Sequence, residues 1–332
     1  MSADIYSQGI ERFNAKDYHG AFKYFNQYIQ LNPYSADAYY VRGFVCKELG
    51  DNQGAFNDYS QAINLGTSYA ADAYTKRGLT RYLMKDWLGA ISDLNQAIEL
   101  NSGSYAYALR ATCRDRLDDL PGAIIEDCNQ AIKLDPNSAL AYGQRGASRL
   151  KVKDYQRAIA DLTKAIELGP NHSSVYLNRG KCYGILGNTQ EAIADFTKCI
   201  QMNPEYKVEV YFVRATVRYK SGDLQGSIVD LTHTIELDPN HANAYYVRSD
   251  QLYNLGDKQG AVNDLTQYLR LNPNNAEAYD LRGVRRYQLG DKQGSIGDFQ
   301  QAAVLYIQQG DYTEYLNEVE LIAKIEKELA NA

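Results

Sequence analysis

Arginine recurs along this sequence at nearly equal intervals, with successive steps of 35, 33, 35, 34, 35, 34 and 34 residues. The positions are Arg42, Arg77, Arg110, Arg145, Arg179, Arg214, Arg248 and Arg282. Three residues before each stands a tyrosine: Tyr39, Tyr74, Tyr107, Tyr142, Tyr176, Tyr211, Tyr245 and Tyr279. Self-similarity at a fixed period of this length is typical of stacked-repeat proteins, in which each unit buries its apolar face against its neighbours. The period therefore predicts the fold class and assigns nearly the whole chain to the stack.

The composition is that of a folded chain and disfavours nucleic acid and membranes as partners. Apolar residues make up 45% of the 332 residues, and the formal net charge is -6. Nucleic acids and anionic lipid surfaces attract clustered lysine and arginine, whereas this chain is acidic. It has no apolar run long enough to span a bilayer, and because its N-terminal residues show no basic stretch followed by an apolar core, we expect no signal peptide. Its five scattered cysteines favour a reducing compartment, so we expect a cytoplasmic protein.

Each period predicts two helices joined by a tight turn. Gly-Asp and Gly-Asn pairs suit the end of one helix followed by the N-cap of the next. Proline then stops the second helix, because it lacks an N–H and disfavours helix in the residue before it. These prolines are Pro33, Pro136, Pro170, Pro204, Pro239 and Pro273. The residue after each arginine is never larger than serine, as in Gly146 and Gly283, so we expect the paired helices to approach closely.

This pattern resembles the tetratricopeptide repeat, a 34-residue helix–turn–helix unit with an aromatic at its fourth position, a small residue at its eighth, alanine at its twentieth and proline near its end. Tyrosine in place of tryptophan and arginine in place of leucine are departures from that pattern. The resemblance implies an all-α, right-handed superhelical solenoid of about nine repeats over residues 4–308, with a capping helix over 311–330. The expected repeats are 4–33, 36–69, 71–103, 104–137, 139–171, 173–206, 208–240, 242–274 and 276–308. The tail resembles the ends of bacterial members of the family, cyanobacterial ones in particular.

The predicted capping helix is amphipathic, with one side more apolar than the other. On a helical wheel Leu316, Val319, Ile322, Ala323 and Leu329 fall on that side, while Glu318, Lys324, Lys327 and Glu328 fall largely on the other. A helix that covers the end of a stack buries its apolar face. We therefore expect the side with Leu316 to dock.

An aspartate in the predicted second helix accompanies every recurring arginine. The aspartates are Asp58, Asp93, Asp127, Asp161, Asp195, Asp230, Asp264 and Asp298. The first repeat lacks both partners and has Gln8 and Tyr24 instead. Because the two residues occur together and are absent together, we interpret them as buried ion pairs that join helices of one repeat or of adjacent repeats. The alternative is an arginine row that binds phosphate groups, which the matched aspartates would neutralise.

A second set of arginines stands four residues after the first set, at Arg81, Arg114, Arg149, Arg218 and Arg286. This spacing places both sets on one helix face. The second set either extends the ionic contacts or forms partly exposed surface charge.

The sequence shows no catalytic or metal-binding motif. It has no phosphate loop ending in Gly-Lys-Ser or Gly-Lys-Thr, no GxGxxG and no HExxH. Its histidines and cysteines do not show the spacing of metal ligands. We therefore expect a non-enzymatic protein without a cofactor or metal.

The resemblance also implies a binding surface, because the first helices of tetratricopeptide repeats line a concave groove in which peptides or partner helices lie. Carried over to this sequence, the middle of the groove is lined by small residues such as Ala108 and Gly184, and its C-terminal third is aromatic and acidic. We predict the partner-binding groove in that third, at Glu209, Phe212, Thr216, Tyr219, Tyr246, Asp250, Tyr253, Glu277, Asp280 and Tyr287. Tyrosine supplies contact area at low entropic cost, and acidic charge favours a partner with basic and apolar residues. The alternative is a solvated face with structural tyrosines.

These features predict a protein–protein interaction scaffold that binds proteins or peptides along its groove. One alternative is an assembly factor, or co-chaperone-like adaptor, that holds subunits of a larger complex. A nucleic-acid-binding helical repeat is another, and the acidic charge disfavours it. No repeat has the lysine and asparagine pair with which some family members grip the carboxylate tails of heat-shock chaperones, so we do not expect that interaction.

Overall fold

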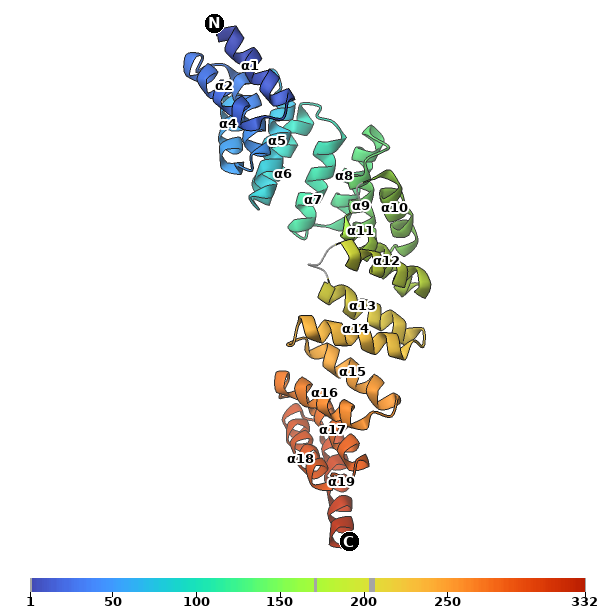
Figure 1. Cartoon of the computed structure of the whole chain (residues 1–332). Helices are drawn as coiled ribbons and strands as arrows, with labels where there is room; N and C mark the ends of the chain where they lie inside the picture. The colour runs from blue at the N-terminus through green and yellow to red at the C-terminus, as the bar shows by residue number, and fades with distance from the viewer. Residues whose placement is uncertain (1, 170–171, 203–206, 332) are drawn as a thin grey trace. The chain divides into compact units, whose positions relative to one another are not determined.

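The computed structural model describes residues 2–169, 172–202 and 207–331. Pro170 and Pro204, which we expected to end second helices, lie outside the described residues. Within them every regular element is an α-helix (Figure 1), so the prediction of an all-α helical-repeat solenoid is confirmed. The chain divides into two compact units, Met1–Cys182 (unit 1) and Tyr183–Ala332 (unit 2).

In unit 1 successive helices form hairpins, and the second helix of each hairpin packs on the first helix of the next. The described helices of this unit are α1 (Ser2–Asn14), α2 (Tyr18–Leu31), α3 (Ala36–Glu48), α4 (Asn52–Asn64), α5 (Ala70–Leu83), α6 (Trp87–Glu99), α7 (Ser104–Arg116), α8 (Pro121–Leu134), α9 (Ala139–Lys151) and α10 (Tyr155–Leu168). The next helix, α11 (Ser173–Ile185), begins in unit 1 and ends in unit 2.

Unit 2 repeats the same arrangement and ends with an additional helix. Its described helices are α12 (Thr189–Met202), α13 (Lys207–Lys220), α14 (Leu224–Leu237), α15 (Ala242–Asn254), α16 (Lys258–Leu271), α17 (Ala276–Gln288), α18 (Lys292–Gln309) and α19 (Tyr312–Ala330). The first helices α13, α15 and α17 carry the predicted groove residues.

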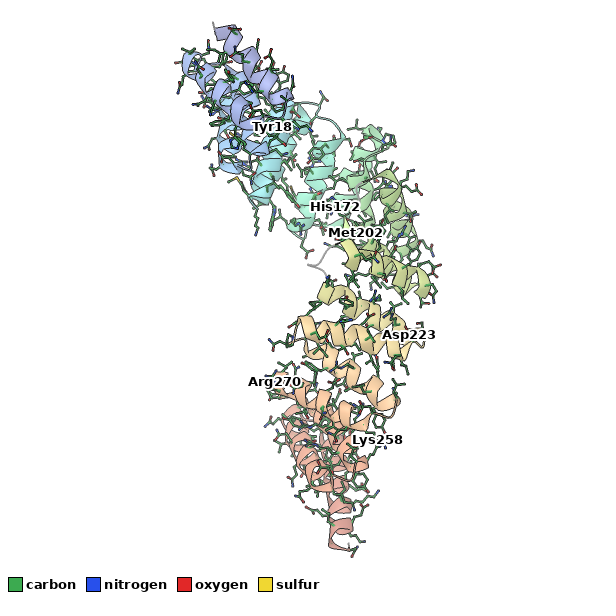
Figure 2. The ribbon with its side chains drawn as sticks, viewed as in Figure 1. Tyr18, His172, Met202, Asp223, Lys258 and Arg270 are labelled. Atoms are coloured by element: carbon green, nitrogen blue, oxygen red, sulfur yellow. The ribbon has the colours of Figure 1, made fainter. Side chains whose placement is uncertain are left out.

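The turn sequence explains where the second helices begin. Asp223 precedes α14 (Figure 2), and its carboxylate accepts a hydrogen bond of 2.8 Å from the Gly226 N–H. A Cβ atom on Gly226 would lie 2.1 Å from that carboxylate, which explains the glycine. Gly222 ends α13 with φ of +85°, a left-handed conformation that glycine adopts without strain. The predicted Gly-Asp turn is therefore a helix stop followed by a side-chain cap.

The small residue after the arginine is needed because the paired helices touch there. An added Cβ on Gly146 in α9 would lie 2.6 Å from Leu162 Cγ of α10, and one on Gly283 would lie 2.8 Å from Phe299. Leu162 is fully buried. The close helix approach predicted from the sequence is confirmed at these positions.

We expect Gly146→Val to lower the free energy of unfolding by about 1–3 kcal/mol, because the larger side chain pushes α9 and α10 apart. Gly297→Ala in α18 is the matched control, since a Cβ there meets no atom within 4 Å. That change should raise stability by roughly 0.5–1 kcal/mol through better helix propensity. Urea unfolding followed by circular dichroism measures both, and equal stabilities of the two variants would contradict the close contact.

The docked face of α19 differs from the predicted one. Leu316 is 62% exposed, and Val319 and Leu329 are exposed as well, whereas Glu318 and Ile325 are buried. Ile325 packs against Ile296 and Phe299 of α18, with Leu321 and Ile322 at the edge of this cluster. The prediction of the docked side is therefore wrong: α19 buries a carboxyl group and leaves a leucine in solvent.

Candidate functional site

The recurring arginines form bidentate ion pairs with the aspartates of their own repeats. In seven repeats the arginine Nε and Nη2 donate to the two carboxylate oxygens at 2.8–3.0 Å and 2.5–2.8 Å. These pairs are Arg42–Asp58, Arg77–Asp93, Arg110–Asp127, Arg145–Asp161, Arg214–Asp230, Arg248–Asp264 and Arg282–Asp298. All seven aspartates are buried. The sequence-based interpretation as buried ion pairs is confirmed for these repeats.

The third guanidinium nitrogen links each of the eight arginines to the preceding repeat. Nη1 donates to a side-chain oxygen of the previous second helix at 2.7–3.2 Å. The acceptors are Asn26, Ser60, Asn95, Asn129, Thr163, Thr197, Thr232 and Thr266. Sequence reasoning missed this row, although an Asn, Ser or Thr stands two residues after each aspartate from Asp58 to Asp264. Each arginine thus holds the preceding repeat, and in the seven ion pairs it joins both helices of its own repeat as well.

The surroundings of these guanidinium groups leave few hydrogen-bond donors and little exposed surface to which a ligand could bind. The tyrosine three residues before each arginine lies with its ring centre 5.3–5.9 Å from the guanidinium carbon. Four arginines of the second set donate to the same aspartates, as Arg218 does to Asp230 at 3.0 Å, and the fifth, Arg81, forms a salt bridge with Asp93 at 3.4 Å. Extension of the ionic contacts, one of the two interpretations of this set, is therefore correct. The geometry favours a structural role over phosphate binding.

Small residues expected to line the middle of the groove are covered by neighbouring helices. Ala108 is buried beside Ala131 and Ala141, the latter on α9. In unit 2, an added Cβ on Gly184 would lie 2.9 Å from Val217 of α13. These positions lie in the contact between adjacent first helices, whereas the sequence predicts them on the exposed lining of the groove.

Three of the ten predicted groove residues meet at one hollow in unit 2. Tyr219 of α13 and Tyr246 and Asp250 of α15 line it, together with Val247, Gln251 and Leu281. The hollow has a volume of about 300 Å³. Tyr219 is exposed, whereas Tyr246 is half-buried with its ring 4.9 Å from that of Tyr268. Burial is also the main cause that raises the pKa of Tyr246.

Beside the hollow, a buried arginine organises α15 and α17. Arg285 is 2% exposed; its Nη1 donates to Ser249 Oγ at 3.0 Å and its Nη2 to Asp250 at 3.4 Å. Its guanidinium carbon lies 4.9 Å from the ring centre of Tyr253, whose hydroxyl donates to Gln288 at 2.7 Å. Burial lowers the pKa of Arg285. Tyr253 therefore supports this cluster and has a hydrogen-bond partner already.

Sequence reasoning missed Gln251 and Arg285, although a signal was present. The residue three positions after the recurring arginine is buried in every repeat that has one. It is small or apolar at Val45, Thr80, Cys113, Ser148, Cys182 and Val217, and then becomes Gln251 and Arg285. The N–H and the carbonyl of the Gln251 side-chain amide both lack a hydrogen-bond partner, which costs about 1–3 kcal/mol for each group. Large polar residues at a packing position mark this end of the array as different.

Four other predicted groove residues lie on the same helices without meeting at the hollow. Phe212 packs against the His241 ring at 4.7 Å, and Thr216 donates to the Phe212 carbonyl of its own helix. Glu209 and Glu277 are exposed. Their carboxylates add negative charge to the face formed by α13, α15 and α17.

The last two predicted groove residues contact α19. The Tyr287 hydroxyl donates to the Glu328 carboxylate at 2.9 Å, and Lys292 pairs with Glu328 at 3.0 Å. Asp280 faces Glu318, and burial raises the pKa of both carboxyl groups. For Glu318 the pKa rises to about 8, with the charge of Asp280 as the second cause. Asp280 and Tyr287 therefore bind the terminal helix in this structure.

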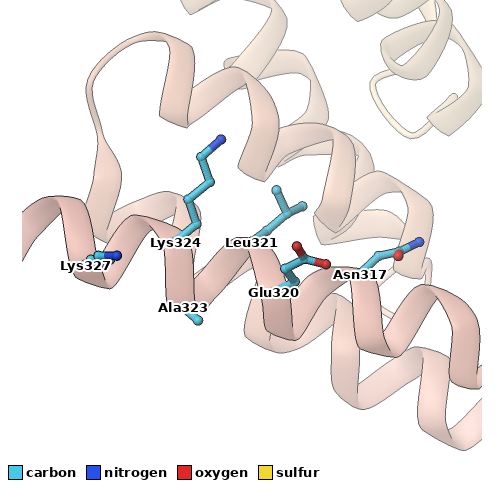
Figure 3. A pocket seen from close by; sticks show the side chains of 6 residues that line it. All are labelled: Asn317, Glu320, Leu321, Ala323, Lys324 and Lys327. Carbon is cyan, nitrogen blue, oxygen red and sulfur yellow. The ribbon is translucent and has the colours of Figure 1, made fainter.

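A depression of mixed chemistry lies along α19 (Figure 3). It is lined by Asn317, Glu320, Leu321, Ala323, Lys324 and Lys327, all from this one helix. Among all described residues, including those of α19, no group of three or more histidine, cysteine, aspartate or glutamate side chains is arranged to hold a metal ion. Nor does any helix among the described residues have the length and apolar character needed to cross a membrane.

Comparison with known proteins places the chain among helical-repeat proteins. Sequence models of the tetratricopeptide repeat match residues 36–65, 139–172, 173–206 and 246–312. The curated tetratricopeptide repeat protein 36 homolog of Nematostella vectensis is 40% identical over 58 residues, which are 18% of this chain and 32% of that protein. The chain therefore matches about a third of the length of this relative.

Two solved structures share the fold at low sequence identity. The structure from the functional characterization of Pseudomonas aeruginosa pilF has a TM-score of 0.53 and 22% identity, over 64% of this chain and 96% of that one. A monomeric IFIT1 mutant with m7Gppp-AAAA has a TM-score of 0.50 and 17% identity, over 87% of this chain and 68% of the other. At these identities the likeness shows the fold alone.

Stacked helix pairs joined by a repeated ionic contact define an α-helical repeat protein. The chain belongs to the tetratricopeptide repeat family. Its fold is that of protein–protein interaction scaffolds in general, and members of this family are typically non-enzymatic.

Proposed function

We propose that the face formed by α13, α15 and α17 in unit 2 binds an extended segment of a partner protein. The hollow at Tyr219, Tyr246 and Asp250 carries this proposal, since it joins exposed aromatic surface to a half-exposed carboxylate. Tyrosines at the centre of a binding surface contribute a large share of affinity. With the exposed Glu209 on α13 and Glu277 on α17, the face favours a segment that combines basic and apolar residues.

The proposal extends to the domain organisation and the cellular location of the protein. Residues 4–308 form the repeat array that presents the face, and residues 311–330 form its terminal cap. The protein works in the cytoplasm, in agreement with five cysteines that are all buried. Within unit 2 the ionic links between repeats hold the helices of the face in place, so the face binds its partner at low entropic cost.

A comparative pull-down tests the proposed face. Wild-type protein and the double variant Tyr219→Ala/Tyr246→Ala are immobilised and exposed to extract from the source cells, and the bound proteins are identified by mass spectrometry. Tyr34→Ala, at an exposed tyrosine in unit 1, is the matched control. We expect partners that the wild type and the control retain and the double variant loses, while circular dichroism shows an unchanged helix content. An identical set of partners for all three proteins would contradict the proposal.

A further inference from the structure

The hollow of unit 2 contains one polar group that the packing of the unit leaves unexplained. The Gln251 side chain is fully buried, and both its amide N–H and its carbonyl lack a hydrogen-bond partner. Equivalent positions in the six preceding repeats with an arginine hold small or apolar residues, so the fold itself does not require an amide here. A ligand that enters the hollow could supply the missing partner.

A carboxylate beside this amide has unused capacity to accept hydrogen bonds. The Asp250 side chain is 49% exposed and accepts only long hydrogen bonds, from Arg285 Nη2 at 3.4 Å and Asn254 Nδ2 at 3.3 Å. An ionised carboxylate has about four acceptor sites. Asp250 is the one charged side chain among the described residues that line the hollow, and its cation Arg285 lies beside the hollow.

The walls of the hollow suit a side chain with an apolar stem and a planar head. Tyr219 and Tyr246 present aromatic rings, while Val247 and Leu281 supply aliphatic surface. An arginine buries its methylene groups against apolar residues, and its guanidinium stacks on aromatic faces while donating in its plane. A lysine ammonium is a strongly hydrated point charge and gains less from such a site.

We propose that this hollow binds the side chain of an arginine in the partner segment. The guanidinium donates to the Asp250 carboxylate and the Gln251 carbonyl, and its plane lies against a tyrosine ring. Because the Gln251 amide is closed to water in this structure, the side chains above it shift when the guanidinium enters. The proposal rests on the proposed function, which supplies the segment that carries the arginine.

Titration with a minimal probe tests the site on the full-length protein. The probe is Nα-acetyl-arginine N-methylamide, and the matched ligand is the citrulline analogue, which has a similar shape and no charge. Binding is followed by nuclear magnetic resonance of the Gln251 side-chain amide. We expect saturable shifts with millimolar affinity for the arginine probe. The citrulline and lysine analogues should bind at least about tenfold more weakly, the effect of losing one charge-assisted hydrogen bond.

Two variants separate binding from folding. Asp250→Asn should weaken arginine binding about tenfold, whereas Asp115→Asn, a matched change on the first helix α7 of unit 1, should leave it unchanged. Gln251→Leu should abolish the response, read from neighbouring methyl resonances, and raise the melting temperature because it removes the unpaired amide. Equal binding of arginine and citrulline, equal binding of arginine and lysine, or unchanged arginine affinity in Asp250→Asn would overturn the proposal.

The two proposals can fail independently. If Tyr219→Ala/Tyr246→Ala loses partners while the arginine probe produces no saturable shift, the binding face stands and the arginine site is wrong. If the probe binds as expected and the pull-downs do not differ, the hollow recognises guanidinium groups and the face is not the partner site.

Discussion

Replacing Arg248 by alanine is expected to lower the free energy of unfolding by about 3 kcal/mol or more. The change leaves the buried Asp264 carboxylate without the guanidinium that donates to both its oxygens. No second arginine compensates from the same helix, since Leu252 stands four residues after Arg248. The hydrogen bond to Thr232 of the preceding repeat is lost as well.

Arg214→Ala is the informative comparison, because its aspartate has a second cation. Asp230 is fully buried, but Arg218 also donates to it at 3.0 Å. We therefore expect Arg214→Ala to destabilise less than Arg248→Ala, and Arg214→Ala/Arg218→Ala to exceed the sum of its single changes. Arg248→Met with Asp264→Leu should be milder than Arg248→Ala alone, since no charge is stranded.

These variants are best compared at the level of single helices. Repeat proteins unfold in segments, so a global transition can hide a local loss. Hydrogen exchange of the α15 and α16 amides, together with urea unfolding, locates the change. If Arg214→Ala were the more damaging single substitution, the ion pair would not be the source of the stability.

Docking of α19 is expected to weaken as the pH rises from about 5 to about 8. Burial and the charge of Asp280 raise the pKa of Glu318 from its ordinary 4.5 to about 8, so the docked helix holds the neutral acid. When α19 is undocked, the Glu318 carboxyl group ionises near pH 4.5. Each further pH unit then lowers the free energy of the undocked state relative to the docked state. At neutral pH this difference is on the order of 3 kcal/mol in favour of release. Docking is therefore strongest in mild acid, below the ordinary pKa.

The groups around Glu318 do not reverse this sign. Asp280 from α17 has its own pKa raised, by burial and by Glu314, and it titrates in the same direction. Glu314 of α19 adds further negative charge, while burial raises the pKa of Tyr306 in α18 to about 12, so this tyrosine stays neutral across the range. No cation contributes to the pKa shift of Glu318.

Glu318→Gln should remove the pH dependence and tighten the helix. At pH 7 we expect the hydrogen-exchange protection of the α19 amides to rise roughly 100-fold over wild type. Glu314→Gln, at a less buried position on the same helix, should have a much smaller effect. Protection factors from pH 5 to pH 9 measure both variants. A wild-type α19 that becomes better protected as the pH rises would show that Glu318 is ionised when docked.

The sequence predicts best what depends on an unvarying residue type. The Arg42–Asp58 contact and its counterparts could be inferred because both partners recur with the period. Their acceptors in the preceding repeat are asparagine, serine or threonine, so no single residue type recurs at this position in the sequence. The shared hydrogen-bonding chemistry becomes visible only when Asn26 or Thr232 is seen against the guanidinium.

Contacts between helices that do not recur with the period could not be predicted from the sequence. A helical wheel of α19 favours burial of Leu316, yet the face with Ile325 fits the end of the stack and carries Glu318 inward with its proton. Likewise, Ala108 occupies a groove position of the family and is covered by a neighbouring helix. Of the predicted groove, the structure brings together Tyr219, Tyr246 and Asp250, while Asp280 and Tyr287 serve α19.

The number of residues between each arginine and its hydrogen-bond partners determines whether the chain can gain or lose a repeat without losing these contacts. In the seven ion pairs the guanidinium contacts its aspartate 16 or 17 residues later, and all eight guanidinium groups contact a side-chain oxygen of the preceding repeat 15 to 17 residues earlier. Duplication or deletion of one whole period therefore recreates both partners at the new junction and strands no charge. The final helix breaks the series, because α19 has no arginine to meet Gln300, which stands two residues after Asp298. We therefore expect added copies to preserve these contacts inside the array, whereas a further repeat placed after Asp298 would need its own arginine to extend the series.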